Sequence, residues 1–176
     1  MEIKYRIGIM PGPWPAGPAG AGFLWELVDL CERSAIDSIW LSDRLSSPVP
    51  VPEVMTTLAA IAARTVRLKF GPSVLVLPYR TPVVAAKEMA TIDYLSGGRL
   101  FPAVGVGVEI PKEFEASGVP FKERGRRTDE AIQIIRRLWL EDEVTFHGEF
   151  YHLDRITIFP KPAQKPPPIW IGGKSD

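Results

Sequence analysis

The segment from Val66 to Gly107 most constrains the fold, because it predicts a strand, a helix and a second strand in succession. The first strand, Phe70 to Leu77, is an apolar, β-branched run that barely alternates, as is typical of a strand buried on both faces. Pro82 opens a helix that ends at the pair Gly97-Gly98. A second strand, Leu100 to Val106, follows. Parallel strands joined by a helix predict an α/β fold with a ligand site at the carboxyl ends of its strands.

The rest of the chain continues this alternation. Further strands are predicted at Tyr5–Met10, at Ser38–Leu41 and, as a buried strand, at Ile169–Gly173. Further helices are predicted at Phe23–Arg33, Glu53–Arg64 and Arg124–Leu140. Loops are predicted over Pro11–Gly22 and around Pro111 and Pro120, and a hairpin over Glu143–Phe146 and Phe150–Leu153. Five strands alternating with four helices predict a parallel sheet, and periodicity leaves open whether it is a (β/α)₈ barrel or a doubly wound sheet.

Length and composition limit the classes of protein to which this chain can belong. A length of 176 residues with 45% hydrophobic side chains predicts one domain, residues 1–176, with a substantial core. Basic and acidic residues both number 21, so we expect no nucleic-acid partner. The single cysteine, Cys31, excludes an intramolecular disulfide, and we expect no metal site. Without an apolar stretch near 20 residues or a signal-peptide pattern, we expect a cytoplasmic protein with no membrane partner.

Two glycine-rich strand ends match phosphate-binding motifs only in part. Gly105-Val106-Gly107 lacks the third glycine of the dinucleotide fingerprint, because position 110 is isoleucine. Gly172-Gly173-Lys174-Ser175 resembles the end of a P-loop, but Pro168 stands where that motif needs glycine. Both motifs are therefore rejected. Two interpretations of these glycines remain. Their backbone N–H groups can approach a phosphate or a flat ring, or the glycines are required only for tight turns and packing.

Polar residues elsewhere indicate where a site lies but do not identify its reaction. Asp43 follows a predicted strand, so its carboxylate is expected at the strand ends. There it has a functional role, in which it orients a ligand or accepts a proton, or a structural role as a cap of the helix or loop. Arg44 contacts an anionic ligand or faces solvent. His147 and His152 have no acid–base partner at suggestive spacing, which favours a structural or solvated role. The arginines from Arg124 to Arg137 lie among acidic residues and predict a salt-bridged, solvated helix face.

Five longer motifs occur in order along the chain: Asp37–Asp43, Val74–Arg80, Leu95–Arg99, Gly118–Arg127 and Pro166–Gly173. Together they resemble the luciferase-like monooxygenase family, in its branch of deazaflavin (coenzyme F-420)-dependent oxidoreductases. The resemblance covers essentially the whole chain.

The resemblance implies a (β/α)₈ TIM barrel that binds FMN or the deazaflavin at the carboxyl ends of its strands. It implies a non-proline cis peptide at Ser73-Val74 behind the flavin ring, a ring or tail contact after the fourth strand, and a phosphate-side loop after the fifth. The cofactor-binding residues implied in this way are Asp43, Ser73, Val74, Gly105, Gly107, Gly172 and Gly173.

The function implied is a flavin- or deazaflavin-dependent oxidoreductase that transfers a hydride through coenzyme F-420 on a small organic substrate. The alternative is an FMN-dependent monooxygenase. Two departures leave the catalytic residue unassigned. Deazaflavin enzymes often carry histidine where this chain has Arg44, and some carry glutamate where it has Val108, with Glu109 one residue later.

The family's barrels continue through three more strands, whereas this sequence ends at Asp176, just after the fifth predicted strand. We therefore expect the N-terminal portion of a barrel, an incomplete barrel of about five parallel strands with flanking helices. The first and fifth strands of such a barrel would have unpaired edges, which favour pairing with another chain or aggregation. The chain is expected to be either a truncated, non-catalytic fragment or a half-barrel that closes against another chain, as a homo-oligomer such as a dimer.

Overall fold

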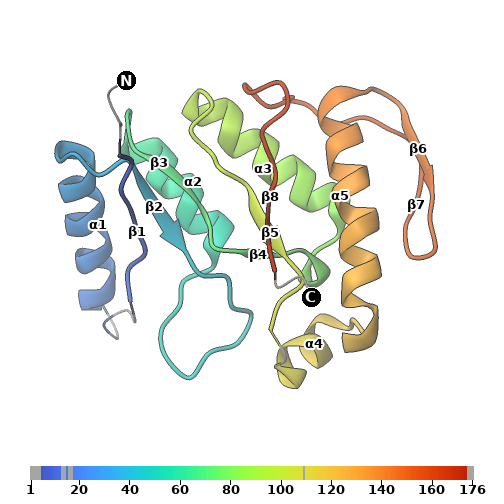
Figure 1. The fold of residues 1–176 in the computed structure, drawn as a ribbon, viewed down its shortest axis with the longest axis horizontal. Helices are drawn as coiled ribbons and strands as arrows, with labels where there is room; N and C mark the ends of the chain where they lie inside the picture. The colour runs from blue at the N-terminus through green and yellow to red at the C-terminus, as the bar shows by residue number, and fades with distance from the viewer. Residues whose placement is uncertain (1–4, 13–14, 16–17, 109, 174–176) are drawn as a thin grey trace.

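The computed structural model describes residues 5–12, 15, 18–108 and 110–173, over which strands and helices alternate (Figure 1). The strands are β1 (Gly8–Ile9), β2 (Ser38–Leu41), β3 (Lys69–Pro72), β4 (Leu75–Val76), β5 (Ala103–Gly105), β6 (Val144–His147), β7 (His152–Ile156) and β8 (Trp170–Gly172). The helices are α1 (Pro18–Arg33), α2 (Val54–Arg64), α3 (Pro82–Ser96), α4 (Pro111–Ser117) and α5 (Arg124–Leu140), with 3₁₀ turns η1 (Leu77–Tyr79) and η2 (Phe121–Glu123).

All strands except the β6–β7 hairpin pair in parallel and follow one another in chain order. One sheet has the order β1-β2-β3 and another the order β4-β5-β8. The two sheets meet where Phe70 of β3 forms a parallel bridge with Leu100, just before β5. A doubly wound sheet reverses its strand order at a switch point, whereas this order has no reversal, as in a barrel.

The core lies between the strands and their helices. In β2, Ile39 and Leu41 are buried, while the alternate residues Ser38 and Trp40 point to the opposite, concave face. Helices α1 and α5 lie at the two ends of the row of strands, with α2 and α3 between them (Figure 1). Among the described residues, no helix is both long and apolar enough to cross a bilayer.

Two predicted loops are wrong in the same way, because each contains a helix that begins with proline. Helix α1 begins at Pro18 rather than Phe23, and α4 begins at Pro111. Proline is favoured at the first helical position, where its missing N–H costs nothing. Helix α4 then ends at Ser117 and is capped by Gly118, whose φ of 70° is typical of a glycine helix cap.

The predicted strand Phe70–Leu77 is divided into β3 and β4, and its last residue begins η1. The division falls at the Ser73–Val74 peptide bond, which is cis as the resemblance predicts. The hairpin is confirmed with shifted bounds. The prediction that the last strand is buried is wrong. Trp170 is 51% and Ile171 72% exposed, because β8 pairs along one edge only within the described residues.

Candidate functional site

A cavity of about 850 Å³ lies at the carboxyl ends of the parallel strands. Its lining comes from the segments that follow β2, β5 and β8, from the β3–β4 junction and from the start of α5. The lining residues are Ser42, Asp43, Arg44, Ser73, Val74, Val76, Val106, Gly107, Val108, Arg124, Gly172 and Gly173. The structure therefore brings six of the seven predicted cofactor-binding residues to one cavity. Gly105 is the exception.

Gly105 and Gly172 accommodate the side chain of Val74. A Cβ atom at Gly105 would lie 2.6 Å from Val74 Cγ2, and one at Gly172 would lie 2.6 Å from Val74 Cγ1. These separations are far below van der Waals contact, so neither position has space for a side chain. Of the two roles that the sequence left open for these glycines, packing is the one that the geometry explains.

Gly107 and Gly173 are placed differently. Gly107 has a φ of 79°, a conformation that favours glycine, and a Cβ there would lie 2.8 Å from Val76 Cγ1. Among the described residues, Gly173 has no atom within 4 Å of its Cβ position, apart from its chain neighbours. No described side chain therefore covers its backbone on the side of the cavity.

Asp43 joins three segments at the strand ends. Its buried carboxylate accepts hydrogen bonds from the Val76 amide at 2.9 Å and from both terminal nitrogens of Arg80 at 2.6 and 3.1 Å. Arg80 also donates to Glu53, the residue that caps α2, at 2.9 Å. Burial acts to lower the pKa of Arg80, but these carboxylates outweigh it and raise that pKa. Asp43 therefore anchors the loop and fixes the shape of the cavity.

Glu113 of α4 is a functional candidate that the sequence analysis missed. Its side chain is buried and accepts hydrogen bonds from Arg44 Nε at 3.0 Å, the Ser46 amide at 2.8 Å and the Tyr79 hydroxyl at 3.0 Å. Burial alone would raise the pKa of Glu113, but these three donors lower it overall. Burial and the Glu113 carboxylate raise the pKa of Tyr79. The sequence predicts a loop around Pro111, and no sequence signal points to this acid.

Arg124 faces the cavity, contrary to the prediction of a solvated helix face. Its neighbours Arg126 and Arg127 are paired with Glu149 and Glu123, as predicted. Arg124 has no carboxylate partner among the described residues. Its guanidinium lies 3.7 Å over the Phe121 ring, its Nη1 donates to the Phe121 carbonyl at 3.0 Å, and its buried Nε has no partner among the described residues. Arg124 is therefore a fixed cation, and some of its N–H groups have no partner within the described part of the chain.

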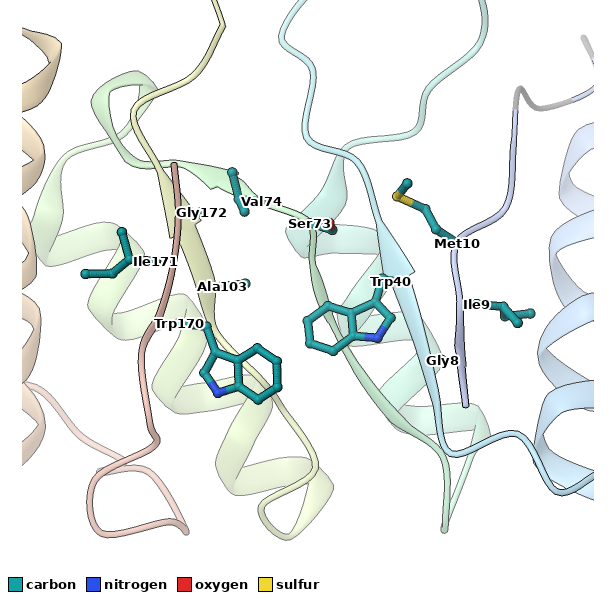
Figure 2. Close-up of a pocket in the computed structure, with 10 residues that line it drawn as sticks. All are labelled: Gly8, Ile9, Met10, Trp40, Ser73, Val74, Ala103, Trp170, Ile171 and Gly172. Carbon is teal, nitrogen blue, oxygen red and sulfur yellow. The ribbon is translucent and has the colours of Figure 1, made fainter. Parts of the chain in front are cut away.

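A second cavity, of about 410 Å³, lies along the concave face of the strands (Figure 2). Trp40 and Trp170 both line it and lie next to each other, with ring centroids 5.7 Å apart. Ser73, Val74 and Gly172 line both cavities, so the two meet at the β3–β4 junction. Within the described ranges, no three His, Cys, Asp or Glu side chains are grouped to hold a metal ion.

Comparison with known proteins shows similarity along the whole chain. The family described as luciferase-like monooxygenase matches residues 1–176. An F420-dependent glucose-6-phosphate dehydrogenase of Amycolatopsis mediterranei is 38% identical over 156 residues, which cover 84% of this chain and 46% of that protein. An FMNH(2)-dependent dimethylsulfone monooxygenase of Pseudomonas putida is 40% identical over 157 residues, covering 85% of this chain and 43% of that protein.

Among solved structures, the monooxygenase RslO1 of Streptomyces bottropensis is similar, with a TM-score of 0.85 and 29% sequence identity. The match covers 95% of this chain and 53% of that one. This chain thus spans about half the length of the curated relatives that it matches.

Proposed function

Because the chain belongs to the luciferase-like monooxygenase family, we propose that it transfers a hydride between coenzyme F-420, a deazaflavin, and a small organic substrate. One observation carries the proposal, the cavity at the carboxyl ends of the parallel strands. This end of a parallel α/β fold is where ligands bind, and about 850 Å³ lies within the usual range for cofactor sites.

The residues around the cavity fit a cofactor with a flat ring and an anionic tail. Arg124 lines the cavity without a carboxylate partner among the described residues, so its remaining guanidinium N–H groups are offered to a phosphate, and no described side chain covers the backbone of Gly173. Val74 and Val76 offer apolar surface to the ring. We assign further contacts to Ser73, Gly107 and Gly172, and supporting roles to Asp43 and Gly105. When bound, the deazaflavin would supply hydride exchange at its ring C5, while the protein holds and orients it.

An FMN-dependent monooxygenase is the second candidate. The Pseudomonas putida relative named above, 40% identical, is FMNH(2)-dependent, and the same cavity features suit the phosphate of FMN. In that case the bound cofactor would supply oxygen activation instead of hydride transfer.

We propose further that the parallel strands β1 to β5 and β8 are the N-terminal part of a (β/α)₈ barrel. The chain-order succession of parallel strands supports this, as does a structural match that spans 53% of RslO1. The concave face exposes Trp170, and within the described residues β1 and β8 are each paired on one side only. We propose that this chain, as given, forms a homo-oligomer, such as a dimer, in which another chain covers that face.

Titration with each cofactor separately tests the assignment. Oxidised F-420 and FMN are added to the protein, and binding is followed by the change in cofactor absorbance and fluorescence. We expect F-420 to bind more tightly, and Arg124→Met to weaken binding about ten- to hundredfold, as for loss of a hydrogen bond to a charged group. Arg126→Met, which removes an exposed arginine of the same helix, is the control. Preferential FMN binding would exclude the deazaflavin, and binding of neither would exclude the site.

A further inference from the structure

Arg44 is held rigidly at the wall of the cavity and still has donors available. Its Nε donates to Glu113 at 3.0 Å, and its Nη2 donates to the Ser46 carbonyl at 3.1 Å. A guanidinium carries five N–H groups, so three remain without a partner among the described residues. The side chain is 32% exposed and lines the cavity.

The other charged groups of the lining are already accounted for. Asp43, which is itself a lining residue, is paired with Arg80. Arg124, at the start of α5, is the cation we assign to the cofactor tail. Among the described lining residues, Arg44 is therefore the remaining charged group that can select a second ligand beside the cofactor.

We infer that Arg44 forms a subsite for a carboxylate on the substrate, an inference that rests on the proposed function for the identity of the neighbouring cofactor. The planar guanidinium matches the two oxygens of a carboxylate, which lysine or an amide cannot do equally well. The substrate class is therefore a small organic acid whose anionic end binds Arg44.

Glu113 is the positioning residue of this subsite. Its carboxylate fixes the Nε edge of Arg44, and Tyr79 and the Ser46 amide fix the carboxylate in turn. The guanidinium is therefore oriented before a ligand arrives, so less side-chain entropy is lost on binding. The unpartnered N–H groups remain for the ligand.

Benzoate and benzamide are matched probes, because they share a shape and differ in charge. Each is titrated into ¹⁵N-labelled protein, without cofactor and with F-420 or FMN, while the Arg44 Nε–Hε signal is followed by NMR. We expect benzoate to bind and to shift this signal, with benzamide much weaker. Arg44→Met should weaken benzoate about ten- to hundredfold. Arg126→Met should leave it unchanged.

Two further variants separate the subsite from folding. Arg44→Lys keeps the positive charge but loses the planar guanidinium that matches both carboxylate oxygens. This variant should bind benzoate with an affinity between those of the wild type and Arg44→Met. Glu113→Gln should move the Arg44 signal and weaken benzoate in the folded protein, whereas a purely structural role would lower only the melting temperature. Equal benzoate affinity in wild type and Arg44→Met, or no preference for benzoate over benzamide, overturns the subsite. If benzoate binds through Arg44 but neither cofactor binds, the subsite stands and the proposed function fails.

Discussion

Val74 lies between two glycines that leave no room for a side chain of their own. Gly105 and Gly172 come from neighbouring strands, β5 and β8, and each faces one methyl group of Val74. The valine lines the candidate cofactor cavity, so the two glycines fix the position of a side chain that we assign to the ring.

Substitution of Gly105 by alanine should therefore destabilise the protein by about 1–3 kcal/mol, the usual effect of overpacking. In a Val74→Ala background the same substitution should cost less, because the opposing methyl groups are gone. Urea unfolding of the two single variants and the double variant measures this coupling. Gly22→Ala, at an open helical position of α1, is the control and should not destabilise. Additive effects of Gly105→Ala and Val74→Ala would contradict the packing.

At the scale of an element, α4 is too short to be stable by itself. It has 7 residues, and an isolated helix of that length does not persist in water. Its stability comes from Phe114, which packs edge-to-face against Tyr79 and Phe121, and from Glu113, which reaches the segment after β2. Helix α4 therefore joins the loops that follow β2 and β5 at the cavity.

The lowered pKa of Glu113 makes this junction sensitive to acid. Because its folded-state pKa lies below the ordinary value near 4.5, the ionised group stabilises the fold fully above that value. The contribution is lost as the pH falls through the lower, folded-state pKa. Glu113→Gln should reduce the free energy of unfolding at neutral pH by about 1–3 kcal/mol, as when hydrogen bonds to a charged group are weakened, because Arg44 remains partly solvated.

The same variant should also flatten the fall of stability that accompanies a decrease of pH below about 4.5. Chemical unfolding at several pH values measures both effects. Glu149→Gln, which removes an exposed partner of Arg126, is the control. A pH profile identical to that of the wild type would show that Glu113 does not carry this dependence.

At the scale of the whole molecule, the concave face of the strands exposes apolar side chains. Met10 is 56% exposed, and Trp170 and Ile171 are also exposed on or beside this face (Figure 2). Exposed apolar surface next to unpaired strand edges favours association.

We expect light scattering after size-exclusion chromatography to show self-association that increases with protein concentration. Trp170→Arg should shift the protein toward monomer, because a charge would be buried in the interface. Leu140→Arg, at the end of α5 on the outer side, should leave the mass unchanged. A wild-type monomer at every concentration would exclude association through the concave face.

Much of the fold could be predicted from local patterns. The apolar runs around Ile39 and Val104, with the helices between them, predict parallel strands because burial imposes these patterns on the sequence. The resemblance located the cis peptide at Ser73 and six residues of the cavity. Errors arose at Pro18 and Pro111, since proline marks both loops and helix starts.

By itself, therefore, the sequence determined the family, the alternation of strands and helices, and the end of the strands at which the cavity lies. Only the tertiary structure decided what individual residues do there. Asp43 is paired with Arg80, Gly105 packs against Val74, and Arg44 is oriented by Glu113. The physical reason is separation along the chain. Glu113 lies 69 residues from Arg44, and no local propensity or periodicity specifies which distant side chain will share a buried charge.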